Sequence, residues 1–199
     1  MPRQVDHELR RRQIAEALLR LTACRGLEAV SLRTVAAEAG LSMGAVQHYF
    51  GSKDEMLLYA VSYQDALRTE RITTRVLAGS AEPTPKAILR ACVAEFLPIT
   101  EQSRTETLVG IAFFIRALSE PALATSYAEN LPKTLTFFAE QIRQGQRSGT
   151  VAADRDPEHE AEILWGLADA QGTEILLGHR TPEQSLATLD YHLDRLFGA

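Results

Sequence analysis

The sequence predicts an all-α protein of 199 residues, and three observations support this fold class. No alternation of apolar and polar residues between turn residues persists for the length of a strand. Four prolines stand where a helix can begin, because the missing N–H of proline costs nothing at the first helical position. Glycines follow several helical segments, and glycine commonly ends helices.

The first expected helix covers about residues 7–25 and is ended by Gly26. Its core face is formed by Ile14, Ala17, Leu18, Leu21 and Thr22. Five later helices are expected over residues 85–97, 103–118, 121–148, 157–177 and 182–197. Gly149 and Gly178 should end the helices at 121–148 and 157–177, and Pro132 should kink or split the helix at 121–148.

Two capping boxes predict further helix starts, since a Ser followed three residues later by Glu can satisfy free backbone donors. Ser52 and Glu55 form one, and Ser103 and Glu106 form the other. The first begins a long helix that continues to about Leu77 and joins the N-terminal part of the chain to the rest.

The stretch that begins at Ser31 contains the most informative pattern. Ser31 is expected to cap one short helix and Ser42 a second, with Gly40 in the turn between them. In the second helix Val46 and Phe50 face inward. A helix of about two turns is not stable alone in water, so its exposed face should serve a partner. The pattern predicts a helix-turn-helix, whose second helix lies in the major groove of DNA.

The charge of the chain is unevenly distributed. The net charge is −5, but residues 1–53 carry eight Lys or Arg against five Asp or Glu, which gives +3. Residues 54–199 carry 13 against 21, which gives −8. A basic end can contact DNA phosphates while an acidic body stays away from the duplex. We therefore expect a DNA affinity that falls strongly with salt.

The composition is that of an ordinary globular protein, with 45% apolar and 24% charged residues. No apolar run approaches the ~18 residues that span a bilayer, and no apolar signal-peptide segment is present, so a cytoplasmic protein is expected. Cys24 and Cys92 stand among apolar residues without a CxxC pair. We interpret both as reduced core residues, with a regulatory thiol as the alternative.

The stretch from Gly26 to Leu57 resembles the DNA-binding domain of the TetR family of transcriptional regulators. The first family motif is matched by Gly26, Ser31, Leu32, Arg33, Val35, Ala36, Ala39, Gly40, Leu41 and Ser42. The second is matched by Gly44, Val46, Tyr49, Phe50, Ser52, Lys53, Glu55, Met56 and Leu57. Many members instead have Lys at Met43, Thr at Ala45 and Tyr at Gln47, so the list of DNA contacts differs here.

The resemblance implies three N-terminal helices for DNA binding and six for ligand binding and dimerisation. The implied domains are residues 1–51 and residues 52–199, with the helix at 52–78 connecting them. The implied function is a homodimeric repressor that binds a palindromic operator in double-stranded DNA and is released by a small-molecule effector. The alternatives are an effector-independent or activating regulator, and a helical small-molecule-binding protein or enzyme that has lost DNA binding.

By resemblance, the recognition helix covers residues 42–49. Gln47 or His48 would read a base edge, and Met43 or Ala45 would touch a thymine methyl group. Phosphate contacts, which set the register without reading sequence, are assigned to Arg33, Thr34, Tyr49 and Lys53. The complete predicted DNA-binding set is Arg33, Thr34, Ser42, Met43, Gly44, Ala45, Gln47, His48, Tyr49 and Lys53.

Some of these assignments have a structural alternative. Tyr49 can instead pack on the first helix, and Arg33 can be a solvated or salt-bridged surface residue. The run Arg10, Arg11 and Arg12 either reaches the DNA backbone or minor groove or forms a solvated helix face.

The last two expected helices carry an apolar seam and several small residues, which permit close helix approach. By resemblance these helices form a four-helix dimer interface with their symmetry mates. The predicted interface residues are Leu164, Ala168, Gly172, Ile175, Leu186, Leu189, Leu193 and Leu196. The alternative is that both stripes complete the core of the single chain.

An effector site is expected among aromatic residues of the body, with a few polar groups for orientation. The predicted ligand-binding residues are Phe96, Phe113, Phe114, Arg116, Tyr127, Trp165, Asp169 and Gln171. For each aromatic residue the alternative is core packing. Asp169 and Gln171 stand in an otherwise apolar stretch, where a buried polar group needs a partner, either an effector or another helix.

No catalytic motif or metal-ligand spacing is recognisable, so neither enzymatic activity nor a cofactor or metal is expected. His159 stands between Glu158 and Glu160 near an expected helix start. Adjacent residues diverge around a helix, so we interpret these three as solvated charges rather than as a shared ligand face.

Overall fold

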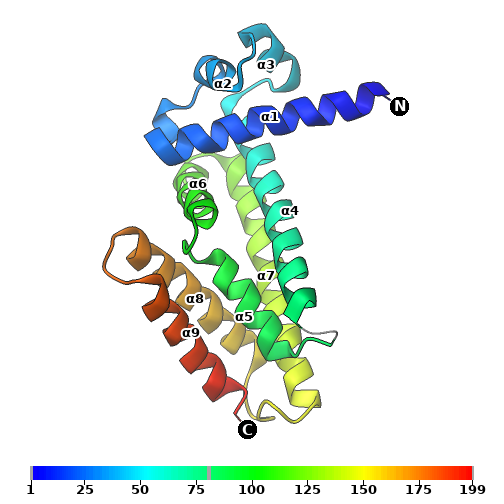
Figure 1. Cartoon of the computed structure of the whole chain (residues 1–199), viewed down its shortest axis with the longest axis vertical. Coiled ribbons are helices and arrows are strands. Elements are labelled where there is room, and N and C mark those ends of the chain that lie inside the picture. The colour runs from blue at the N-terminus through cyan, green and yellow to red at the C-terminus, as the bar shows by residue number, and fades with distance from the viewer. Residues whose placement is uncertain (1, 80–81, 199) are drawn as a thin grey trace. The chain divides into compact units, whose positions relative to one another are not determined.

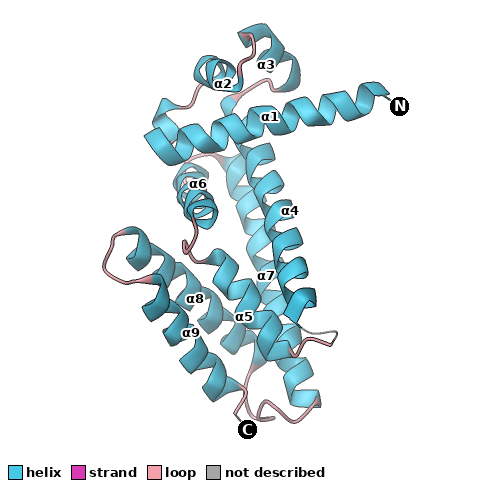
Figure 2. Ribbon diagram, in the orientation of Figure 1, coloured by secondary structure: helices cyan, strands magenta, loops and turns pink. Residues whose placement is uncertain are grey.

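A computed structural model describes residues 2–79 and 82–198, and their fold is all-α, as predicted. These residues form nine α-helices and one short 3-10 helix and include no strand (Figure 2). The elements are α1 (Pro2–Arg25), η1 (Leu27–Ala29), α2 (Leu32–Ala39), α3 (Met43–Tyr49), α4 (Lys53–Gly79), α5 (Pro85–Phe96), α6 (Glu101–Ala117), α7 (Pro121–Arg147), α8 (Pro157–Leu176) and α9 (Pro182–Leu196). None of the described helices combines the length and apolar character that crossing a membrane requires.

Most helix ends lie where side-chain caps and glycines predicted them. A side-chain oxygen accepts a first-turn backbone N–H, which helix geometry leaves free, at Ser31, Ser42, Thr84, Asp156 and Thr181. Positive φ angles, a backbone region that favours glycine, occur at Gly26, Gly40, Gly149 and Gly178. These local predictions are confirmed.

The two predicted capping boxes differ from their expected form. The start of α6 is capped by Thr100, whose Oγ1 accepts the Ser103 N–H at 3.0 Å while Ser103 Oγ accepts the Thr100 N–H at 2.9 Å. The predicted pair of Ser103 and Glu106 is therefore wrong, because the helix already begins two residues before Ser103. At α4, Ser52 caps as expected, but Glu55 accepts from the Gly51 N–H instead of completing the box.

Two further expectations are corrected. Pro132 does not split α7, which continues from Pro121 to Arg147 with Pro132 exposed. A kink at Pro132 stays a prediction. Cys24 is exposed rather than part of the core. Cys92 is buried as expected, and burial raises the pKa of its thiol to about 12, which makes it unreactive.

Contacts divide the chain into two compact units, which we call unit 1 and unit 2. Unit 1 comprises the chain as far as Leu67 together with Thr105–Tyr127, and unit 2 comprises Arg68–Arg104 and the chain from Ala128 onward. Within unit 1, α2 and α3 lie on one side of α1 (Figure 1). Within unit 2, α5 packs against both α8 and α9. The division at residues 51 and 52 implied by the family resemblance stays a prediction.

The core of unit 1 holds the helix-turn-helix to α1. Ile14 and Leu18 of α1 are fully buried, as are Val35 of α2 and Val46 of α3, and Phe50 closes the end of α3. Burial of each side chain of this size stabilises the fold by about 1.5–3 kcal/mol. The predicted core face of α1 is confirmed.

The core of unit 2 contains most of the residues that were assigned to a dimer interface. Leu164, Leu189 and Leu193 are fully buried within the single chain, and Ala168, Gly172, Ile175 and Leu196 are also buried. The side chains of Leu164, Leu189 and Leu193 have no exposed surface in the single chain, so they have none to lose to a partner. The assignment of the whole set to a dimer interface stays a prediction. Leu186 is partly buried and packs on the same core. The alternative, that both stripes complete the core of the chain, accounts for their burial.

Candidate nucleic-acid interface

The turn between α2 and α3 is fixed by the backbone of Gly40 and by a bond from α1. Gly40 has φ 67° and ψ 31°, and the Leu41 N–H donates to the Ala36 carbonyl at 2.9 Å. From α1, Gln13 Nε2 donates to the Ala39 carbonyl at 2.8 Å. The end of α2 is thereby held on both sides, which sets the angle at which α3 leaves the turn.

The helix α3 presents an outer face and buries a narrow inner one. Val46 is fully buried, whereas Gln47 and His48 are exposed and Met43 is 46% exposed. Tyr49 is only half-buried. Seven of the predicted DNA-binding residues are exposed on or beside this face or at the start of α2: Arg33, Thr34, Ser42, Met43, Gly44, Gln47 and His48.

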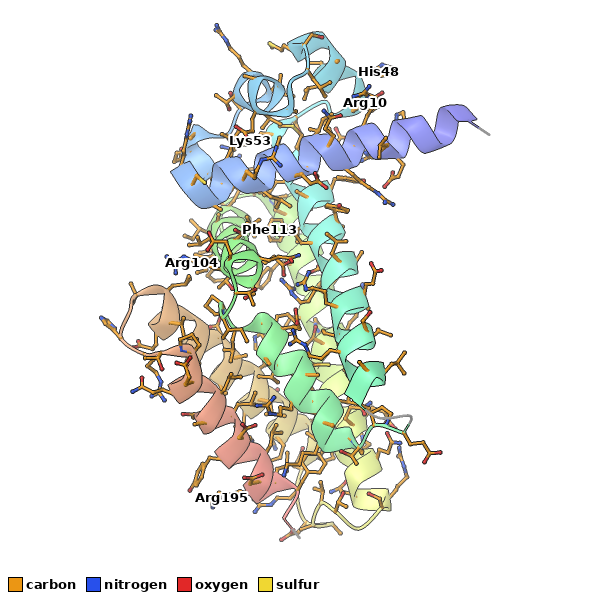
Figure 3. The ribbon with its side chains drawn as sticks, in the orientation of Figure 1. Arg10, His48, Lys53, Arg104, Phe113 and Arg195 are labelled. Carbon is orange, nitrogen blue, oxygen red and sulfur yellow. The ribbon has the colours of Figure 1, made fainter. Side chains whose placement is uncertain are left out.

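Two of the predicted phosphate-binding side chains also have structural partners. Thr34 Oγ1 donates to the Ala29 carbonyl at 2.9 Å and accepts the Ser31 N–H at 2.9 Å, so its hydroxyl completes the cap of α2. Lys53 Nζ donates to the Leu27 carbonyl at 2.6 Å, and its position is shown in Figure 3. The remaining ammonium protons of Lys53 are available to an anion.

Tyr49 belongs to a cluster of three rings that the sequence did not predict. Its ring centroid lies 4.7 Å from that of His7 on α1 and 5.1 Å from that of His48, and the two imidazoles are 6.4 Å apart. Tyr49 therefore packs on the first helix, which was the structural alternative, and its ring is still partly exposed. His7 was missed because no spacing rule connects two residues about 40 positions apart.

The N-terminal half of α4 is tied to α1 by two tyrosines. Tyr59 Oη donates to Glu8 Oε1 at 2.6 Å, and Tyr63 Oη donates to Glu16 Oε1 at 3.0 Å. The bond from Tyr59 lowers the pKa of the Glu8 carboxyl. Burial, and then the bond to Glu8, raises the pKa of Tyr59 to about 12. Both hydroxyls therefore stay protonated as donors at neutral pH.

The predicted effector residues fall into two groups, one in each unit. In unit 1, the ring of Tyr127 lies 6.3 Å from Phe113, which is buried, and 5.4 Å from Phe114, which is partly exposed. Arg116 pairs there with Asp54 at 3.2 Å and Glu120 at 3.0 Å, so its guanidinium already has two carboxylate partners. An effector would have to compete with both for Arg116.

In unit 2, Phe96 and Trp165 make an edge-to-face contact with centroids 5.1 Å apart, and the Arg68 guanidinium lies 4.7 Å from the Phe96 centroid. Asp169 is exposed, so it needs no buried partner, contrary to expectation. Gln171 is half-buried, and its Oε1 accepts no hydrogen bond from the described residues.

Comparison with known proteins places this geometry in a family. The model of bacterial regulatory proteins of the tetR family matches residues 14–60, and the model of the C-terminal part of BetI-type transcriptional repressors matches residues 85–198. The HTH-type transcriptional regulator PksA of Bacillus subtilis is 33% identical over 186 residues, which are 89% of this chain and 83% of PksA. The HTH-type transcriptional regulator BetI of Burkholderia mallei is 35% identical over 62% of each chain.

Solved structures give the same result over nearly the whole chain. A transcriptional regulator from Rhodococcus sp. Rha1 is 27% identical with a TM-score of 0.80, covering 94% of this chain and 95% of the other. A regulator from Saccharomonospora viridis, crystallised in complex with choline, is 25% identical with a TM-score of 0.83, covering 94% and 96%. The relatives are named as transcriptional regulators. The helix-turn-helix described above, together with both family models, shows that this chain belongs to the TetR family of transcriptional regulators.

Proposed function

We propose that this regulator is a homodimeric repressor that occupies a palindromic DNA operator and leaves it when a small molecule binds to its body. The observation that carries the proposal is the division of α3 into two faces. Val46 anchors the helix in the core, while Gln47 and His48 are exposed. A polar, outward face on a helix of seven residues fits the major groove.

The DNA contacts follow from that division. Gln47 can bond bidentately to an adenine, and Met43 can touch a thymine methyl group. Arg33 at the start of α2 is exposed and can contact a phosphate, as can the free protons of Lys53. One such helix reads too few base pairs for specificity, and a two-fold dimer on two half-sites supplies the rest.

The dimer interface is proposed on the side of α8 and α9 that the core leaves exposed. Ile163 is 51% exposed and Tyr191 is 63% exposed. Gly166 and Ala170 lie on the same side of α8 as Ile163, at helical spacing, and are exposed as well. Apolar and small side chains together permit a second copy to approach closely.

Release by an effector is proposed from the family and from the aromatic groups of the body. The match to BetI-type repressors covers residues 85–198, and a relative was crystallised with choline. The Phe96–Trp165 pair and the half-buried Gln171 supply apolar and polar groups for a small molecule in unit 2. An effector shifts the protein off DNA only if it binds the DNA-incompetent state more tightly.

The test is fluorescence anisotropy with labelled DNA from upstream of the protein's own gene and with scrambled DNA as control. We expect tighter binding to the upstream DNA and saturation at two chains per site. Gln47→Ala should remove about 1–3 kcal/mol of discrimination between the two DNAs. Gln144→Ala, an exposed glutamine on α7, is the matched control and should change nothing.

Choline is the first effector to add in the same assay, followed by other small molecules. Equal affinity of the wild type for both DNAs, repeated with sites selected from random DNA, would contradict the proposal. A DNA affinity that no small molecule changes would instead favour an effector-independent regulator.

A further inference from the structure

The N-terminal turns of α1 lie beside the recognition helix although they are outside the helix-turn-helix. His7 contacts Tyr49 and His48 through its ring. Arg10 stands one helical turn further along α1 and is exposed. Figure 3 labels Arg10 on α1 and His48 on α3.

The three consecutive arginines of α1 have different partners. The Arg11 guanidinium lies 4.3 Å from the Tyr59 centroid and 4.9 Å from the Phe50 centroid, so it is held against the core. Arg12 pairs with Glu8 at 3.4 Å. Arg10 donates to the neutral Oε1 of Gln13 at 2.8 Å, and no carboxylate among the described side chains pairs with it. Arg10 is exposed, and Gln13, its partner among the described side chains, is neutral.

The bond between Arg10 and Gln13 also fixes where that charge lies. Gln13 uses its Oε1 to accept from Arg10 and its Nε2 to donate to the Ala39 carbonyl at the end of α2. This chain of two bonds links the Arg10 guanidinium to the turn that orients α3. A guanidinium has further N–H donors in a rigid fork that matches the oxygens of a phosphate.

We propose that Arg10 contacts a backbone phosphate of the bound DNA and that Gln13 is the positioning residue that holds it beside α3. This inference rests on the proposed function, because it adds a contact to the same DNA-binding surface. Arg11 and Arg12 are not assigned this role, since the first is stacked on aromatic rings and the second is paired with Glu8.

The experiment measures the salt dependence of binding to upstream DNA and to random-sequence DNA. Each phosphate contact that is lost lowers the slope of log affinity against log salt by about 0.9. Arg10→Gln should lower the slope by about this amount per chain on both DNAs and weaken binding about tenfold. Arg12→Gln, which removes the same charge at a neighbouring position, should leave the slope unchanged. Arg10→Lys should keep most of the slope.

Gln13→Met tests the positioning role. It should lower the salt slope in the wild-type background and lower it no further in the Arg10→Gln background, because the two residues act through one phosphate contact. Loss of the bond from Gln13 to the Ala39 carbonyl weakens the affinity in both backgrounds but removes no phosphate contact. Thermal unfolding of each variant checks that the fold is intact.

An unchanged slope in Arg10→Gln, or equal losses in Arg10→Gln and Arg12→Gln, would overturn the assignment of Arg10. Losses of salt slope that add up when Gln13→Met and Arg10→Gln are combined would overturn the positioning role of Gln13. Failure of the wild type to prefer any DNA sequence would overturn the proposed function alone, because the Arg10 contact is still measured on random-sequence DNA.

Discussion

The helix-turn-helix and the α8–α9 pair both present a face that is not buried in the core, but their sequences reveal it to different degrees. In α3 the residues on the outside are polar, small or flexible, and the inside is marked by Val46 and Phe50. In α8 and α9 apolar residues lie on both sides, and the regular leucine stripe is the side that faces the chain's own core. An apolar stripe identifies a buried side without telling which partner buries it.

The largest expected effect is the difference in stability between alanine substitutions on the buried side and on the exposed side of α9. Leu189→Ala should lower the free energy of unfolding by about 2–5 kcal/mol, because Leu189 is fully buried and the cavity cannot collapse completely. Tyr191→Ala, on the exposed side of the same helix, should leave the stability of the monomer nearly unchanged. Urea unfolding at several protein concentrations measures both effects. If Leu189→Ala weakened dimerisation and left the stability of the monomer unchanged, Leu189 would belong to the dimer interface.

A smaller effect is expected at the turn that orients α3. Gly40→Ala should destabilise the protein by about 1–2 kcal/mol, since Gly40 has φ 67° and an L side chain is strained there although its Cβ would meet no atom within 4 Å. Gly44→Ala is the matched control, because Gly44 is helical and its Cβ also has open space. Differential scanning calorimetry should show a lower Tm for Gly40→Ala and an equal or higher Tm for Gly44→Ala.

The caps of α3 and α9 allow the same chemical change in both regions. Ser42→Ala and Thr181→Ala should each cost about 1 kcal/mol of stability, since each removes an oxygen that accepts a first-turn N–H. Only Ser42→Ala should also weaken DNA binding, because Ser42 caps a helix of just seven residues that carries the proposed DNA-reading face. If Ser42→Ala bound DNA as tightly as Thr181→Ala, the result would show that α3 keeps its position without the cap.

The smallest effect concerns the tyrosine contacts between α1 and α4. The folded protein holds the pKa of Tyr59 at about 12, whereas a tyrosine in an unfolded chain ionises near 10. The stability contributed by the neutral phenol is therefore complete below about pH 10 and is lost as the pH rises through about 12. Tyr59→Phe should remove this alkaline loss. Tyrosinate absorbance during a pH titration, compared between the wild type and the variant, measures it.

The parts of the fold that depend on neighbouring residues were predictable from the sequence. Caps such as Ser31 and helix ends such as Gly149 follow from local hydrogen bonds, and their positions agree with the structure. The start of α6 was misplaced because Thr100 offered an equally good cap three residues before Ser103. Cys24 was misassigned because an apolar neighbourhood in sequence does not give the direction of a side chain on a helix.

The long-range polar contacts of the DNA-binding surface could not be predicted. The bond from Lys53 to Leu27 and the bond from Gln13 to Ala39 each join residues 26 positions apart. No periodicity connects such pairs, since they depend on how α1, α2 and α4 pack. The family resemblance predicted which residues face DNA, but the distribution of partners among the arginines of α1 depends on how the helices of unit 1 pack.

The short helix α3 has an evolutionary consequence. Val46 inside the helix and Phe50 at its end are its buried residues, so stability constrains these two positions most and leaves Met43 and Gln47 free to change, whereas His48 contacts two rings. A duplicated gene could therefore acquire a new set of target promoters through substitutions that leave the scaffold intact. The same property makes Met43 and Gln47 a suitable starting point for a library that retargets the protein to a chosen DNA sequence.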